Sequence, residues 1–161
     1  MSDALAEVEA TFEFLESELG FTRDGQRRAN GGFEVRYAKD DVGVLVDWYP
    51  RDPLTVWLVR LVDGGFPPKG KTEIRADSTL HYFDLGDLET VAGCPETDQR
   101  SLNAPSAENA RVLASSLRTC GESLLSGDTR QFDELQEHVK RRAREVTISH
   151  YGQEYARSLG W

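Results

Sequence analysis

One string in the sequence has the residue types and spacing of a phosphate-binding loop: Gly65-Phe66-Pro67-Pro68-Lys69-Gly70-Lys71-Thr72. In that pattern backbone amides surround the phosphates, the lysine contacts them and the hydroxyl holds magnesium. The chemistry requires a parallel strand before the loop and a helix N-terminus at its end. Here the preceding strand is expected in an antiparallel meander, and residues 73–78 make a poor helix. We therefore keep a nucleotide-binding enzyme using Gly65, Gly70, Lys71 and Thr72 as the alternative function, and a lysine-bearing loop as the main interpretation.

Histidines and paired acids are the next groups that could perform catalysis. His81, His138 and His150 are scattered along the chain, and neither a His-Glu-x-x-His string nor a Gly-x-Ser-x-Gly turn occurs. Asp84 and Asp87 are expected to be solvated turn residues. We therefore predict no catalytic residue, no metal site and no cofactor, and we favour a protein that is not an enzyme.

The two cysteines, Cys94 and Cys120, form no Cys-x-x-Cys pair and have no histidine nearby, so we expect two reduced thiols. Whether Cys94 is reactive depends on a base close to it in space, which spacing does not show. Residues 1–7 lack the features of a secretory signal, and no apolar stretch approaches the ~20 residues of a membrane span. The sequence therefore predicts a cytoplasmic protein that is not inserted in a membrane.

Acidic residues outnumber basic ones by 28 to 19, which gives a formal net charge of -9. Such a charge repels the phosphate backbone, so nucleic acid is not expected as a partner. The acids concentrate in the first helix, where no basic residue precedes Arg23; they are Asp3, Glu7, Glu9, Glu13, Glu16 and Glu18. This stripe is either a solvated helix face or a surface that would attract a basic protein.

Hydrophobic periodicity predicts one α+β domain over residues 1–161. We expect a helix over 1–20, a polar connection, an antiparallel meander over 33–62, a loop-rich connector over 63–105 with one strand near 79–84, and a helical hairpin over 106–150. The predicted fold is an antiparallel sheet of about four strands, with the N-terminal helix and the C-terminal helical hairpin packed on one face.

The strand pattern also predicts which side chains share a face. With Tyr37 opposite Val42 and Tyr49 opposite Leu54, each hairpin has a four-residue loop and Trp57, Val59 and Leu61 join the apolar core face. The other face then mixes apolar and charged residues, and it is either half covered by a loop or a docking surface. Its candidate partner contacts are Glu34, Arg36, Asp47, Tyr49 and Arg60.

Three segments resemble a group of small bacterial cytosolic proteins of unknown function: Phe33-x-Val35-x-Tyr37, Val42-x-Val44-x-Val46-x-x-Tyr49-x-Arg51 and the run Leu124-Leu125-Ser126-Gly127-Asp128-x-x-x-Phe132-x-x-Leu135. An acidic antiparallel sheet with flanking helices is also similar to the immunity proteins that accompany bacterial toxins. The resemblance implies a binding role and no catalytic residues. We therefore expect a protein-binding module of immunity or adaptor type, with another protein, favoured to be basic, as its partner; oligomeric state stays open.

Overall fold

A computed structural model describes residues 3–70 and 73–161 and gives an α+β fold. Five antiparallel strands form one sheet in the order β1-β2-β3-β4-β5. The strands are β1 (Thr22–Ala29), β2 (Gly32–Lys39), β3 (Val42–Trp48), β4 (Thr55–Arg60) and β5 (Tyr82–Asp84). The predicted fold class is confirmed, with one strand more than expected.

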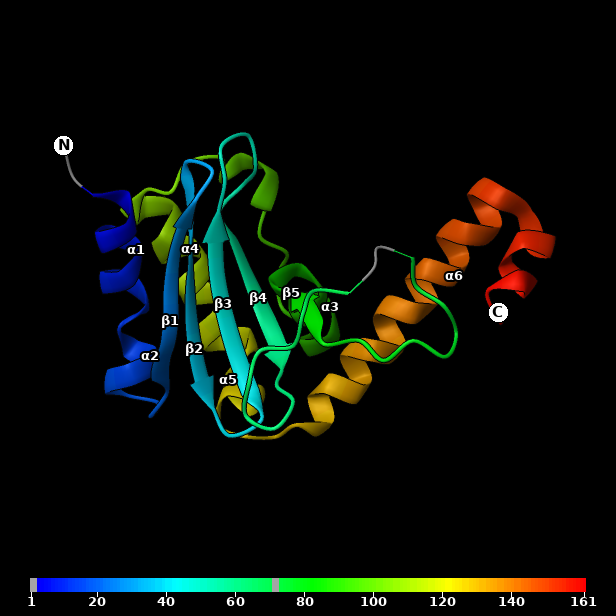
Figure 1. Cartoon of the computed structure of the whole chain (residues 1–161), viewed down its shortest axis with the longest axis horizontal. Helices are drawn as coiled ribbons and strands as arrows, with labels where there is room; N and C mark the ends of the chain where they lie inside the picture. The colour runs from blue at the N-terminus through cyan, green and yellow to red at the C-terminus, as the bar shows by residue number, and fades with distance from the viewer. Residues whose placement is uncertain (1–2, 71–72) are drawn as a thin grey trace.

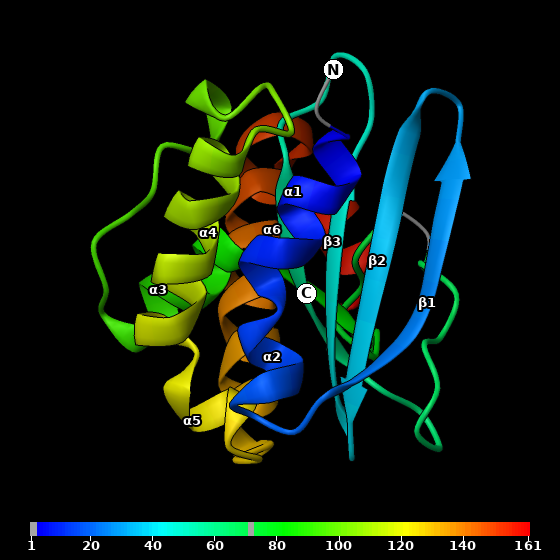
Figure 2. The same cartoon turned by 90° about the vertical axis from the view of Figure 1, so that its left-hand side faces the viewer.

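The helices lie on one face of the sheet, which we call the inner face (Figures 1 and 2). They are α1 (Ala4–Phe12), α2 (Phe14–Ser17), α3 (Leu85–Ala92), α4 (Ala107–Cys120), α5 (Glu122–Leu125) and α6 (Arg130–Ser158), with a short 3-10 turn, η1, at Gln99–Ser101. Ser106 caps α4, because its side chain accepts a hydrogen bond from the Asn109 backbone N–H. The main core fills the space between these helices and the sheet.

Strand β1 occupies the segment that we expected to be a polar connection. Its sequence, TRDGQRRA, has no apolar alternation because the strand lies at the edge of the sheet and most of its side chains are exposed. A register shift between Arg23 and Gly25 marks a bulge at Asp24. Edge strands are commonly protected from further pairing by charge and by such bulges, and this is why the hydrophobic pattern missed the strand.

The pairing of the central strands corrects the predicted register. Lys39 pairs with Val42, so the first hairpin has a two-residue loop, and Tyr37 lies opposite Val44. That two-residue shift leaves every side chain on its expected face. The next hairpin differs by one residue, since Val46 pairs with Val56.

A one-residue difference exchanges the two faces of β4. Leu54, Val56 and Leu58 therefore enter the main core, whereas Val59 and Leu61 join Leu45 in a second, smaller apolar cluster on the opposite side of the sheet, which we call the outer face. Trp57, Phe66 and Tyr82 pack against this second cluster. The segment 61–70 that follows β4 covers this part of the outer face, as the edge-on view shows (Figure 2).

Cys94 and Cys120 are joined by a disulfide, with their Cα atoms 6.0 Å apart. The prediction of two reduced thiols is therefore wrong. Cys94 follows the left-handed Gly93 that ends α3, and Cys120 is the last residue of α4, so the tertiary packing of these two helix ends brings together residues separated by 26 positions. Sequence spacing alone carried no sign of that contact.

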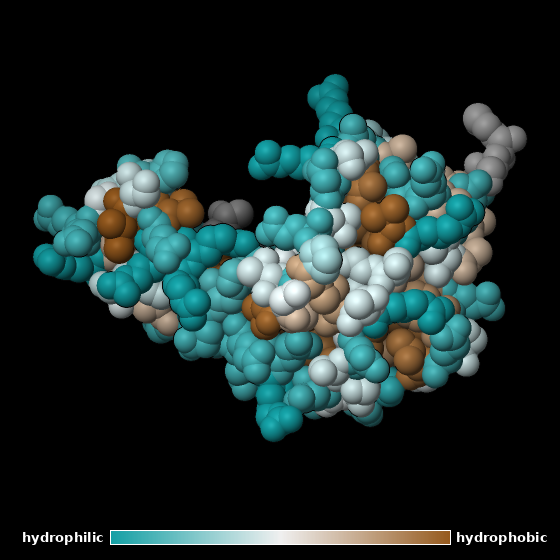
Figure 3. Space-filling view, turned by 180° about the vertical axis from the view of Figure 1, so that it is seen from behind, coloured by the Kyte–Doolittle hydropathy of each residue, from teal (hydrophilic) through white to brown (hydrophobic). Residues whose placement is uncertain are grey.

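The last helix is longer than expected and leaves the body of the molecule. Its first half packs against α3 and α5, and its second half projects beyond the sheet (Figure 1). A kink at Gly152, where φ is 84°, turns the end of α6 back on itself. The projecting end forms a separate lobe in the space-filling view (Figure 3). Among the described residues, no helix combines the length and the apolar character that a membrane span requires.

Candidate functional site

Four of the five predicted contact residues lie together at the outer face. Glu34 and Arg36 come from β2, Asp47 from β3, and Tyr49 directly follows β3. Arg60 lies on the inner face instead, where its guanidinium forms an ion pair with Asp133 of α6 at 2.7 Å. The one-residue register difference in β4 is the reason, because it exchanges the sides of Arg60 and Trp57.

Glu34 is a buried carboxylate held by its neighbours. The Tyr49 hydroxyl donates a hydrogen bond to it at 2.8 Å, and the Arg36 guanidinium donates another at 3.2 Å. Burial by itself would raise the pKa of Glu34, but the Tyr49 hydrogen bond and the charges of Arg36 and Lys69 together lower that pKa. Burial and the hydrogen bond to Glu34 raise the pKa of Tyr49 to about 12. The carboxyl is therefore ionised and the phenol protonated at neutral pH.

Asp47 lies directly opposite Glu34 in the sheet. The Trp57 indole N–H donates a hydrogen bond to it at 3.1 Å, and the Lys69 ammonium donates one at 3.2 Å. Burial raises the pKa of Asp47, and the proximity of Lys69 offsets this only in part. Two neighbouring carboxyls thus occupy different electrostatic environments, each with its own cation and its own aromatic donor.

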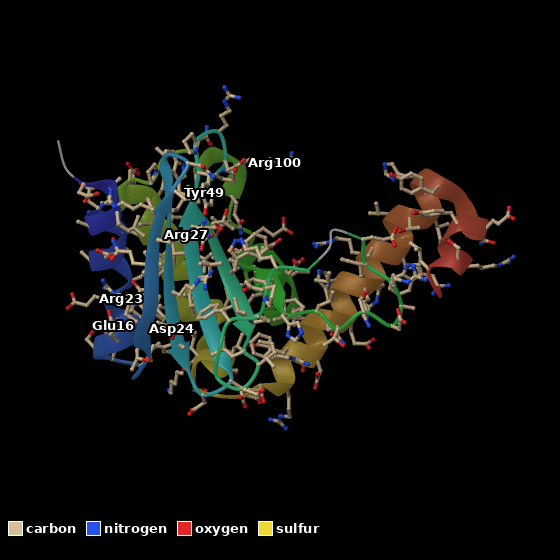
Figure 4. All side chains as sticks on the ribbon, viewed as in Figure 1. Glu16, Arg23, Asp24, Arg27, Tyr49 and Arg100 are labelled. Carbon is tan, nitrogen blue, oxygen red and sulfur yellow. A yellow bond between two sulfur atoms is a disulfide. The ribbon has the colours of Figure 1, made fainter. Side chains whose placement is uncertain are left out.

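The exposed ends of this network are cationic. The side chains of Glu34 and Asp47 are 11% and 10% exposed, whereas those of Arg36 and Lys69 are 38% and 48% exposed. Arg27, on β1 opposite Glu34, is also exposed. A depression of about 240 Å³ lies between β1 and β2, lined by Asp24, Gly25, Gln26, Arg27, Glu34 and Arg36. Figure 4 labels Asp24 and Arg27 on β1 and shows Tyr49 close to Arg27. We call Arg27, Arg36 and Tyr49 the open patch.

The segment 61–70 decides how much of the outer face is open. The Arg36 guanidinium lies 5.3 Å from the centre of the Phe66 ring, and the Tyr82 hydroxyl donates a hydrogen bond to the Pro67 carbonyl at 2.5 Å. Val62 and Gly65 form an isolated antiparallel bridge. Of the two alternatives that the sequence left open, the loop therefore covers one part of the face, and the open patch remains beside it.

The phosphate-loop alternative is not favoured by the residues around it. β4, which precedes the loop, is antiparallel to both of its neighbours. Gly65 forms a tight turn with Val62, Gly70 lies on the exposed loop, and residues 73–81 contain no helix. Lys71 and Thr72 lie outside the described residues. The described flanks thus offer no helix N-terminus for a phosphate group, and nucleotide binding stays a prediction.

The acidic first helix is largely paired within the molecule. Arg23 of β1 contacts Glu9 at 3.0 Å and Glu16 at 3.1 Å. Two further ion pairs, Arg28–Asp3 and Arg118–Glu18, have distances of 2.6 and 2.8 Å. Three arginines of β1 and α4 thus pair with four of the six acids and offset part of the charge of the stripe, and a basic partner stays a prediction.

The other candidate chemical groups have structural partners. Asp87, expected to be solvated, is 4% exposed and lies between the Arg142 guanidinium and His138, whose Nε2 is 3.4 Å away. Burial and the nearby Asp84 raise the pKa of Asp87 above its usual value. Cys94 is engaged in the disulfide, so it has no free thiol. Within residues 3–70 and 73–161, no group of three or more His, Cys, Asp or Glu side chains is placed to hold a metal ion.

Exposed aromatic residues at the end of α6 are a surface that the sequence reasoning missed. Tyr151 and Tyr155 are 70% and 42% exposed, and their ring centres are 5.2 Å apart. The four-residue spacing of the two tyrosines around Gly152 is the signal in the sequence that could have indicated this surface.

No protein family model, no curated protein and no solved structure matches this chain. The geometry of the outer face is therefore the basis for a functional proposal.

Proposed function

We propose that this chain is a non-enzymatic protein-binding module, of adaptor or immunity type, that takes an acidic segment of another protein on the open patch. One observation carries the proposal: the carboxylates of Glu34 and Asp47 are buried beneath the cations that they hold, so the outer face presents guanidinium and ammonium groups beside a tyrosine. Arg27, Arg36 and Lys69 together balance Asp24, Glu34 and Asp47, so this part of the surface does not share the net charge of -9.

The residue types of the open patch suit protein recognition. Arginine and tyrosine are enriched among the residues that dominate interface energies. A guanidinium can also hold a carboxylate through two parallel hydrogen bonds. Arg27 and Arg36 line the same depression, so a glutamate or aspartate from a partner could bind between them. The first helix favours a basic partner less than its composition suggests, because arginines of this chain pair with four of its six acids.

The test compares two charge reversals at exposed arginines. Arg27→Glu changes the open patch, and Arg111→Glu makes the same change on α4, far from it in the fold. We expect a tagged wild-type chain to capture one protein in stoichiometric amount from a lysate of its own cells. Arg111→Glu should bind that protein equally well, and Arg27→Glu at least tenfold more weakly.

Added salt should weaken the wild-type complex, since exposed charges are screened within about 10 Å at 0.1 M ionic strength. Equal binding by the Arg27→Glu and Arg111→Glu variants would remove the open patch as the contact surface. A strictly monomeric chain that captures no stoichiometric protein would contradict the binding function itself.

The compartment is part of the proposal. The sequence analysis predicts a cytoplasmic protein, whereas the Cys94–Cys120 disulfide is of a kind that persists mainly in oxidising environments. The proposed recognition of an acidic segment is the same in either compartment, because neither cysteine belongs to the open patch.

A further inference from the structure

A second concave site lies on the other side of segment 61–70 from the open patch. It is a cavity of about 380 Å³ between β4, β5, α6 and the connector, within the size range of small-molecule sites. Its described lining is mainly apolar and aromatic, with few polar groups: Trp57, Pro68, Lys69, Gly70, Ile74, Thr79, Leu80, His81, Tyr82 and Val139.

The aromatic walls of this cavity are held in place from behind. The Trp57 indole N–H is bound to Asp47, and the Tyr82 hydroxyl is bound to the Pro67 carbonyl. The Leu80 backbone N–H is bound to the Gln136 side chain of α6 at 2.9 Å. Because these groups already have hydrogen-bond partners, a ligand would meet flat, fixed apolar surfaces and would lose little affinity to ordering them.

Two polar groups at the cavity still have hydrogen-bonding capacity. Lys69 donates to Asp47 and lies 5.1 Å from the centre of the Trp57 ring, but an ammonium has three donors. His81 Nδ1 contacts the Arg60 carbonyl at 3.3 Å, so Nε2 is the ring nitrogen left for another group. These are the convergent polar groups that give an apolar pocket its orientation and specificity.

The charge balance indicates what kind of molecule fits. The positive charge of Lys69 is offset by Asp47 at 3.2 Å, and Glu34 is the cross-strand neighbour of Asp47. An anion would therefore meet these two carboxyls, and no described carboxylate lines the cavity to hold a cation. A neutral ligand with an acceptor atom for Lys69 avoids the repulsion that an anion would meet, and it needs no carboxylate partner as a cation would.

We propose that this cavity is a binding site for a small, neutral, planar aromatic molecule that carries a hydrogen-bond acceptor. The ring would lie against Trp57 and Leu80, and the acceptor would contact the Lys69 ammonium. The cavity shares no residue with the open patch, although Lys69 lies between the two, and its test requires no protein partner.

The experiment uses three probes with one ring system: indole-3-carboxamide, indole-3-carboxylate and indole-3-methylamine. The three tryptophan indole N–H signals are followed by nitrogen–proton correlation NMR, and Trp57→Phe identifies the Trp57 signal. We expect the neutral carboxamide to shift the Trp57 signal with a Kd of about 1 mM or tighter. The signals of Trp48 and Trp161 should stay in place, and the charged probes should bind at least fivefold more weakly.

Leu80→Arg places a charged side chain in the apolar wall and should weaken carboxamide binding at least tenfold. Val112→Arg, at an exposed apolar position of α4, is the control and should leave binding unchanged. Unshifted Trp48 and Trp161 signals show that each variant is folded. The proposal is overturned if millimolar carboxamide does not move the Trp57 signal, if the carboxylate or the amine binds more tightly, or if Leu80→Arg binds as wild type.

Discussion

Glu34 and Asp47 face each other across β2 and β3, yet the pKa values of their carboxyls move in opposite directions. The two side chains have similar exposed fractions, but more protein surrounds the Asp47 carboxyl, so both burial and hydrogen-bond partners contribute to the difference. Glu34 has a strong donor in Tyr49 and a guanidinium within hydrogen-bond distance, which favour its charged form. At Asp47 burial outweighs the single ammonium and the indole donor.

Replacing each carboxyl by its amide should therefore change stability with opposite pH dependences. The pKa of Glu34 lies below its ordinary 4.5 in the folded state, so its stabilisation is present above that pH and is lost as pH falls through the folded pKa. The pKa of Asp47 lies above its ordinary 3.8, so its contribution is complete below pH 3.8 and is lost as pH rises through the folded pKa.

Urea unfolding between pH 3 and pH 7 measures both effects. Relative to wild type, Glu34→Gln should lose stability as pH rises, by about 1–2 kcal/mol at pH 7, and Asp47→Asn should gain. Asp52→Asn, at an exposed turn residue, controls for the loss of one negative charge. Identical pH profiles for all three variants would contradict the assigned environments.

Among the elements, segment 61–70 has the largest effect on the outer face. It carries Phe66 onto the small apolar cluster of Leu45, Val59 and Leu61, and it carries Lys69 to Asp47. Gly43 of β3 allows this close approach, because a Cβ at that position would lie 2.7 Å from Leu61 Cδ2 and 2.9 Å from Phe66 Cζ. A glycine within a strand is here explained by what packs over it.

Phe66→Ala should lower the free energy of unfolding by about 2 kcal/mol, less than for a fully buried phenylalanine because the ring is partly exposed. Gly43→Ala should also destabilise, by steric conflict with Phe66 and Leu61. Its cost should fall when Phe66→Ala is already present, since one of the two clashing side chains is then gone. Urea unfolding of the two single variants and the double variant measures this coupling, and strictly additive changes would argue against the contact.

At the scale of the whole molecule, opposite charges from distant parts of the chain pair across the layers that the apolar core holds together. Arginines of β1 and α4 pair with the acids of the first helices, and Arg142 of α6 pairs with Asp87 of α3. The disulfide adds a covalent link between the ends of α3 and α4. The net charge of -9 therefore says little about any one surface, because four of the six acids of the first helices form ion pairs with three arginines.

Reduction of the disulfide should lower the free energy of unfolding by about 3.5 kcal/mol, the value of closing a loop of this length in the unfolded chain. Urea unfolding with and without a phosphine reductant measures the loss. The double variant Cys94→Ser with Cys120→Ser should be as unstable as the reduced protein and insensitive to the reductant. A wild-type protein that does not respond would show that the link contributes nothing. Alkylation during lysis of the source cells reports whether the bond exists there, and with it the compartment.

The sequence by itself determined the class of fold and most of the inner core. Apolar residues at helical and alternating spacing identified the first helix, the three central strands and the C-terminal helices, because each of these elements buries one face against its neighbours. It also identified Glu34, Arg36, Asp47 and Tyr49 as residues of one face, since β2 and β3 keep their alternation under a two-residue register shift.

Only the tertiary structure decided the rest. β1 carries no apolar pattern, because a strand at the edge of the sheet need not bury a row of apolar side chains. β4 has apolar residues on both of its faces, so its pattern fits two registers that differ by one residue, and the register decides on which face Arg60 and Trp57 lie. The ion pairs of the first helix, the disulfide and the cavity beside Trp57 join residues far apart in the chain. The spacing of apolar residues within one helix or strand reflects which of its faces is buried, whereas these contacts depend on how separate helices and strands pack against each other.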